Sequence, residues 1–168
     1  MSTRATSETV ERTDGMETPT EMTERIAGVE SWQAGVVAGL LGSIAFGAMM
    51  AVVSPGALTA AIPAMYGLSG GMAGMFIHLS HGAILGVAFA AILRTRPDFG
   101  ATIGRATAVG AAYGVVLWVV LAVLLMPVWL SAVGFAGAPP LPNVDAMSLI
   151  GHVVYGIVLG AAYPLLRR

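Results

Sequence analysis

The sequence predicts an all-α membrane protein with four transmembrane helices arranged as two repeated helical hairpins, and three observations support this prediction. Hydrophobic residues make up 57% of the 168 residues and charged residues only 10%, a composition too apolar for a soluble domain of this size. The apolar residues gather in four blocks, each long enough to cross a bilayer as a helix. Similar spacings of histidine, glycine and arginine recur in the two halves of the chain.

Residues 1–31 differ from the rest of the chain. They are rich in Thr, Ser and Glu, contain more acidic than basic residues, and have few large apolar side chains. Such a segment cannot bury enough surface to fold alone, so we expect a disordered, acidic, cytoplasmic tail. It lacks the basic start and adjoining apolar core of a secretory signal. The membrane domain is therefore expected to span residues 32–168.

The four predicted helices cover residues 33–53, 71–93, 106–126 and 146–166. Helices are expected instead of strands because each segment must satisfy its own backbone groups in lipid. Pro55 and Pro127 follow the first and third segments and are expected to end them. The connections at 54–70 and 127–145 are apolar and rich in Pro and Gly, which indicates either short interfacial helices or packed connectors.

Arginine positions predict the orientation. Outside the tail, arginine occurs only between the second and third segments and after the fourth, at Arg94, Arg96, Arg105, Arg167 and Arg168. The positive-inside rule then places both termini in the cytoplasm and the protein in the cytoplasmic membrane, with the apolar loops outside.

An internal alignment of the two halves places His78 on His152, Gly82 on Gly156 and Gly86 on Gly160. This indicates two hairpins with parallel topology, and it sets the two histidines at equal depth. Pairs of glycines four residues apart occur in every segment, which favours close helix packing. The helix faces that carry these glycine pairs would pack either against helices of the same chain or against a second copy in a homo-oligomer.

Polar side chains within the apolar segments define the candidate sites. His78 and His81 of the second segment and His152 and Tyr155 of the fourth are candidate cofactor-binding residues, because polar groups in a bilayer turn towards the bundle interior. His78 and His152 suit haem b ligation from two helices. Met72, Met75, His78 and His81 form a row of soft ligands for copper, whereas a buried histidine bonded to a helix carbonyl and a methionine that fills a gap need no ligand.

Several function classes are excluded by what the sequence lacks. Asp98 and Asp145 are the acidic residues beyond the tail, and they lie on opposite sides of the predicted membrane, so no carboxylate pair is available for acid–base catalysis. No basic patch indicates nucleic-acid binding, and the absence of cysteine excludes thiolate chemistry.

Four glycine-rich stretches, GVVAGLLGSIAFG, IPAMYGL, HLSHGAILG and GHVVYGIVLG, carry a resemblance to a known group of proteins. The chain resembles the uncharacterised small four-helix integral membrane proteins of halophilic archaea over nearly its whole length beyond the tail. The resemblance implies a membrane location and four helices. It carries over no functional residues, because that group has no established activity.

The sequence thus favours a non-enzymatic structural or accessory protein of the lipid bilayer, acting as a homo-oligomer or within a larger membrane complex. A haem- or copper-binding protein for electron transfer or ion passage is the alternative. A permease for small solutes is the third interpretation.

Overall fold

A computed structural model describes residues 30–167, and within that range it contains helices and loops but no strands. Four helices are long and apolar enough to cross a membrane, as in a multi-pass membrane protein. They are α2 (Ser31–Val53), α4 (Gly71–Thr95), a continuous helix over Ile103–Ala132, and α7 (Ala146–Leu166). Residues 1–29 of the tail predicted at 1–31 lie outside the described residues.

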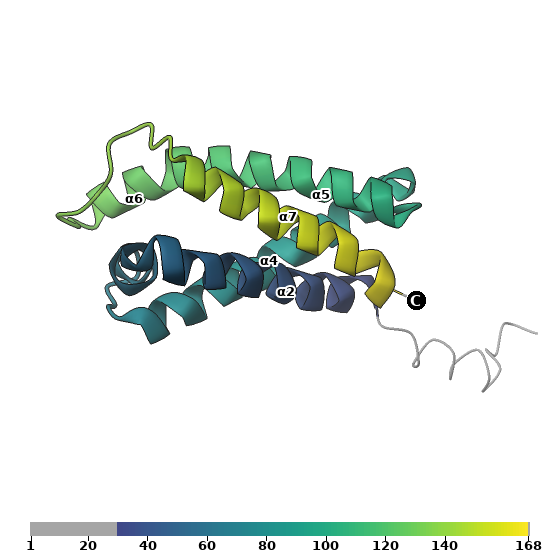
Figure 1. The fold of residues 1–168 in the computed structure, drawn as a ribbon, viewed down its shortest axis with the longest axis horizontal. Helices are drawn as coiled ribbons and strands as arrows, with labels where there is room; N and C mark the ends of the chain where they lie inside the picture. The colour runs from purple at the N-terminus through teal and green to yellow at the C-terminus, as the bar shows by residue number, and fades with distance from the viewer. Residues whose placement is uncertain (1–29, 168) are drawn as a thin grey trace, which may run out of the picture.

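The helices form two layers, with α2 beside α4 in one and α5 (Ile103–Leu117) beside α7 in the other (Figure 1). Helix α2 also packs against α7, which joins the layers. The start of α2 and the end of α7 lie at the same end of the bundle, together with the turn that holds η2 (Pro97–Gly100) (Figure 1). The layers lie farther apart at the opposite end, which carries the two long connections (Figure 1). We refer to these as the arginine end and the loop end.

Glycine allows the helices within each layer to touch through their backbones. A Cβ added to Gly39 of α2 would overlap the carbonyl oxygen of Gly82 in α4, and a Cβ on Gly110 of α5 would overlap that of Gly156 in α7. Lipid tails are as apolar as the helix surfaces, so in lipid the hydrophobic effect does not drive helices together. Their association depends instead on close packing of this kind. The same kind of contact therefore holds each of the two helix pairs together.

The third membrane helix continues beyond the end expected at Met126. It runs from α5 through a π-helical stretch, η3 (Trp118–Leu125), into α6 (Met126–Ala132), so Pro127 does not end it. Proline supplies no N–H to the preceding turn, and the backbone N–H of Asn143 donates instead to the Val123 carbonyl oxygen, 3.0 Å away. The Asn143 side chain reaches the Ala122 carbonyl oxygen at 3.5 Å. The expectation failed because a donor from the following loop serves the carbonyls that proline leaves unpaired.

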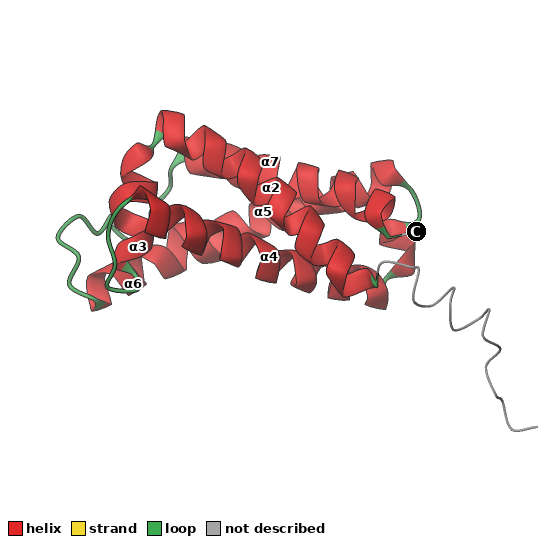
Figure 2. Ribbon diagram, turned by 90° about the horizontal axis from the view of Figure 1, so that it is seen from below, coloured by secondary structure: helices red, strands yellow, loops and turns green. Residues whose placement is uncertain are grey.

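The connections at the loop end are packed segments with helical turns of their own. The first contains η1 (Ala57–Ala61) and α3 (Ile62–Ala64), and η1 rests on α4 where Gly74 has no side chain to block the Leu58 carbonyl. Both α3 and α6 lie at the loop end (Figure 2), where the rings of Tyr66 and Trp129 meet with centroids 5.5 Å apart. This contact joins the first connection to the end of the third helix.

Two glycine variants in the same helix test the role of backbone contact. Gly110→Ala should lower the free energy of unfolding by about 1–3 kcal/mol, because its methyl group would meet the Gly156 backbone. Gly104→Ala is the matched control, since nothing lies within 4 Å of its added Cβ, and it should be neutral or stabilising by up to about 1 kcal/mol. Thermal unfolding in detergent, followed by tryptophan fluorescence, measures both. Equal losses in the two variants would contradict this account of the packing.

Candidate functional site

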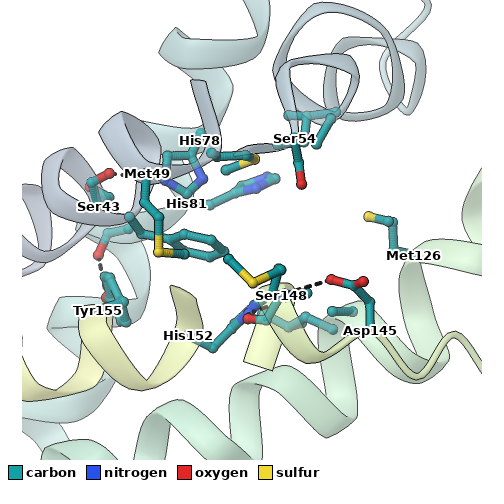
Figure 3. A pocket seen from close by; sticks show the side chains of 18 of the residues that line it. Ser43, Met49, Ser54, His78, His81, Met126, Asp145, Ser148, His152 and Tyr155 are labelled. Carbon is teal, nitrogen blue, oxygen red and sulfur yellow. Dashed lines mark hydrogen bonds between the residues drawn. The ribbon is translucent and has the colours of Figure 1, made fainter. Parts of the chain in front are cut away.

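A cavity of about 460 Å³ lies between the two helix layers towards the loop end. Its wall combines residues of α2, α4, η3 and α7 with residues of both long connections (Figure 3). All three histidines of the chain line it, and so does Tyr155. The four side chains that the sequence indicated as cofactor-binding candidates, His78, His81, His152 and Tyr155, are therefore brought together around one space.

Two of these histidines are fixed by backbone carbonyl groups. Nε2 of His78 lies 3.0 Å from the carbonyl oxygen of Ser43, and Nδ1 of His152 lies 2.8 Å from that of Ser148. A carbonyl oxygen only accepts, so each of these ring nitrogens carries the proton and donates it. In the neutral rings the lone pairs then lie on Nδ1 of His78 and Nε2 of His152. Both of these nitrogens can bind a cation or accept a hydrogen bond.

Phe46 of α2 packs against both histidine rings. Its centroid lies 5.2 Å from that of His78 and 4.9 Å from that of His152, with edge-on geometry in each case. Gly151 makes room for this ring, because an added Cβ would overlap the Phe46 ring atoms. Phe46 therefore sets the position of the α4 histidine relative to the α7 histidine.

His81 belongs to the part of the cavity covered by the first connection. Its Nε2 lies 2.6 Å from the hydroxyl oxygen of Tyr66, and the two rings have centroids 5.8 Å apart. Tyr66 in turn contacts Trp129, which also lines the cavity. The hydroxyl of tyrosine donates or accepts, so this bond leaves the tautomer of His81 open.

None of the methionines that line the cavity belongs to the predicted copper row. Met72 is 90% exposed, and neither it nor Met75 lines the cavity, so the structure does not bring the row Met72, Met75, His78 and His81 together around one space. The spacing gives the reason: each step of three residues turns the side chain by about 60°, so a row of four winds around the helix and its first and last members point in opposite directions. The cavity wall contains five other methionines, Met49, Met50, Met65, Met126 and Met147.

Two tyrosine hydroxyls join the helix layers, and one of these tyrosines, Tyr155, lines the cavity. Tyr155 of α7 donates to the Gly82 carbonyl oxygen at 2.8 Å, and Tyr113 of α5 donates to the Leu85 carbonyl oxygen at 2.9 Å. Both acceptors belong to α4, so these bonds join the two helix layers. Beyond them the interior is filled by large buried side chains, namely Phe89, Leu93, Leu159 and Tyr163. Sequence reasoning missed Tyr113, although it is the one tyrosine of the third predicted segment.

The arrangement offers binding chemistry. It has hydrogen-bond acceptors, thioethers and aromatic faces, and Asp145 is its one carboxylate. That carboxylate accepts the Ser148 backbone N–H at 2.6 Å, as the cap of α7. Among residues 30–167 no three His, Cys, Asp or Glu side chains are grouped to hold a metal ion.

Comparison with family models, curated protein sequences and solved structures finds no match for the chain.

Two tyrosine-to-phenylalanine variants test the hydrogen bond by which Tyr155 joins the helix layers. Tyr155→Phe should lower the free energy of unfolding by about 1 kcal/mol because the bond to the Gly82 carbonyl is lost. Tyr163→Phe is the matched control: its hydroxyl is buried without a hydrogen-bond partner among the described residues, so its removal should cost nothing or stabilise the protein. Unfolding in mixed micelles with increasing dodecyl sulfate gives both values. The reverse order of stabilities would show that Tyr155 does not join the layers in this way.

Proposed function

We propose that this chain is a non-enzymatic accessory protein of the membrane that binds a small ligand in the cavity between two helical hairpins. One observation carries the proposal: every histidine of the chain and five methionines from separate parts of it line the same cavity. Polar side chains within membrane helices are costly, and their convergence on one space is typical of a binding site.

The topology that we propose places the cavity in the outer half of the bilayer. Arg94, Arg96, Arg105 and Arg167 belong to the arginine end, which the positive-inside rule assigns to the cytoplasm. The glycine contacts of α2 with α4 and of α5 with α7 support the two repeated hairpins. The exposed apolar side chains of the helices would face lipid, a second copy or a larger membrane complex.

The other interpretations of the histidines receive less support from the geometry. Haem b shared by His78 and His152 is not favoured, because the Phe46 ring contacts both imidazoles and the Nε2 of His78 is bonded to Ser43. A permease needs a path across the whole membrane. Tyr155 lines the cavity, whereas the interior towards the arginine end is filled by the buried side chains of Phe89, Leu93, Leu159 and Tyr163.

Cysteine labelling tests the orientation without background, because the chain contains no cysteine. We expect Val144→Cys, an exposed residue of the loop end, to react with a membrane-impermeant maleimide in intact cells. Asp98→Cys, at the arginine end, should react only after the cells are lysed. The opposite pattern would invert the topology and place the cavity in the cytoplasmic half of the bilayer.

Filling the cavity tests ligand binding. Ala122 lines the cavity from η3, so Ala122→Phe should displace a bound ligand by occupying its space. Ala112→Phe is the matched control, because Ala112 is exposed on the same continuous helix. Native mass spectrometry of protein released from membranes should show an added mass on the unmodified chain and on the control, and not on Ala122→Phe.

Either of two results would contradict the binding function. One is the absence of any added mass on all three proteins under the mildest release conditions. The other is an added mass that persists in Ala122→Phe, since a molecule held elsewhere, such as a lipid on the outer surface of the helices, would not respond to filling the cavity.

A further inference from the structure

Four polar side chains of the cavity wall have already used their hydrogen-bond donors. The hydroxyl of Ser43 donates to a carbonyl oxygen of its own helix, α2, and the hydroxyl of Tyr155 donates to one of α4. His78 and His152 donate their N–H groups to carbonyl oxygens of α2 and α7. We call these four residues the inner wall, because each lies more than one helical turn from the loop end of its helix (Figure 3). What the inner wall still offers to a ligand is lone pairs.

The free nitrogen of each inner-wall histidine lies away from the carbonyl that holds the ring. In His78 the edge formed by Nε2 and Cδ2 faces α2: Nε2 is bonded to the Ser43 carbonyl, and a Cβ on Gly47 would lie 3.2 Å from Cδ2. Nδ1 lies across the ring from that edge. In His152 the bonded Nδ1 lies next to α7, so Nε2 is at the far end of the side chain. Each ring therefore brings one unpaired acceptor to the cavity that it lines.

The other polar side chains of the cavity differ from the inner wall. His81 is paired with the Tyr66 hydroxyl beneath the first connection. The remaining ones belong to the loop end: Ser54, Trp129, Asn143, Asp145 and Ser148. The single carboxylate of the cavity, Asp145, is among them, and it is exposed. A ligand group that reaches the inner wall thus meets hydrogen-bond acceptors and no charge.

We propose that the cavity binds a neutral, lipid-soluble molecule with a hydroxyl group, an alcohol or a phenol, whose hydroxyl donates to Nδ1 of His78 or to Nε2 of His152. The two acceptors belong to different helix layers and act separately. This inference rests on the proposed function and names the chemical class of its ligand.

The inner wall favours a hydroxyl over other polar groups. A ketone, ester or amide would bring a carbonyl oxygen to a surface that has only acceptors, and an unpaired polar atom in such a site costs free energy. An ammonium group donates, but it would be a buried charge without a carboxylate beside it, because Asp145 lies at the loop end and caps α7. A hydroxyl supplies one donor and carries no charge.

The apolar part of the wall explains why the ligand is lipid-soluble. Ile84 of α4 and Leu125 of η3 line the cavity, yet they are 66% and 44% exposed. Both belong to helices that are apolar enough to cross a membrane. The cavity wall is therefore continuous with the apolar outer surface, and a molecule dissolved in the bilayer can reach it from the side. A volume of about 460 Å³ suits a molecule of drug size, and the flexible methionines can adapt to its shape.

Two probes that differ in one hydrogen-bond donor test the proposal. In para-octylphenol the ring carries a hydroxyl, whereas in para-octylanisole it carries a methoxy group, which only accepts. Full-length protein in detergent is titrated with each probe, and native mass spectrometry measures the bound fraction. We expect about one octylphenol per chain and binding of octylanisole that is about tenfold weaker or more. Equal affinities, or tighter binding of the anisole, would overturn the proposal.

Amide variants remove the acceptors and keep the bonds that position the side chains. His78→Gln retains an N–H at the place of Nε2 for the carbonyl of α2, and His152→Asn retains one at the place of Nδ1 for the carbonyl of α7. In the double variant the affinity for octylphenol should fall about tenfold, to that of octylanisole. His81→Gln is the matched control, because His81 is already paired with Tyr66, and it should keep the preference for the phenol.

The same loss in His81→Gln as in the double variant would contradict the assignment of the acceptors. If the double variant does not fold, the comparison of the two probes on the unmodified chain still decides.

The Ala122→Phe variant separates this inference from the proposed function. An added mass from the membrane that disappears in Ala122→Phe, without any preference for octylphenol, would leave the binding function standing and remove only the hydroxyl ligand. Octylphenol that still binds to Ala122→Phe would lie outside the cavity, which also overturns the inference. The absence of both the added mass and a bound probe would remove both.

Discussion

Backbone contact at glycine is the interaction on which the rest of this structure depends. At Gly39 and Gly82, and again at Gly110 and Gly156, two helices approach so closely that no Cβ fits between them. Van der Waals contact and hydrogen bonds replace the hydrophobic effect as the source of helix association in lipid. The closeness also brings the carbonyl groups of one helix within reach of the side chains of the next.

Those carbonyl groups organise the polar side chains of the interior. Tyr155 and Tyr113 donate to carbonyls of α4, and His78 donates to a carbonyl of α2. A helical carbonyl oxygen has a second lone pair, so it accepts such a bond while it keeps its place in the helix. Neutral polar side chains are thereby satisfied without charges, as a low-dielectric environment requires. The same bonds decide which nitrogen of each histidine stays free.

The cavity lies where the layers are farther apart, towards the loop end (Figure 1), and residues of both connections line it. Large side chains fill the arginine end, whereas flexible methionines and the three histidines surround the open space. Asn143 contributes in two ways: it lines the cavity, and it supplies the hydrogen bonds that let the third helix pass Pro127. The connection is therefore part of the cavity wall as well as a link between helices.

The sequence by itself determined that the chain has four apolar helices and that histidine lies within two of them, because length and hydropathy are properties of contiguous residues. It also placed His78, His81, His152 and Tyr155 among the candidates that the structure finds around one cavity.

Only the tertiary structure decided which methionines accompany the histidines, since Met49, Met126 and Met147 come from distant segments and share no sequence spacing. It also decided that the third helix passes Pro127, because the donor that permits this, Asn143, lies in a loop beyond it. Contacts between distant residues fix both features, and no local pattern carries that information.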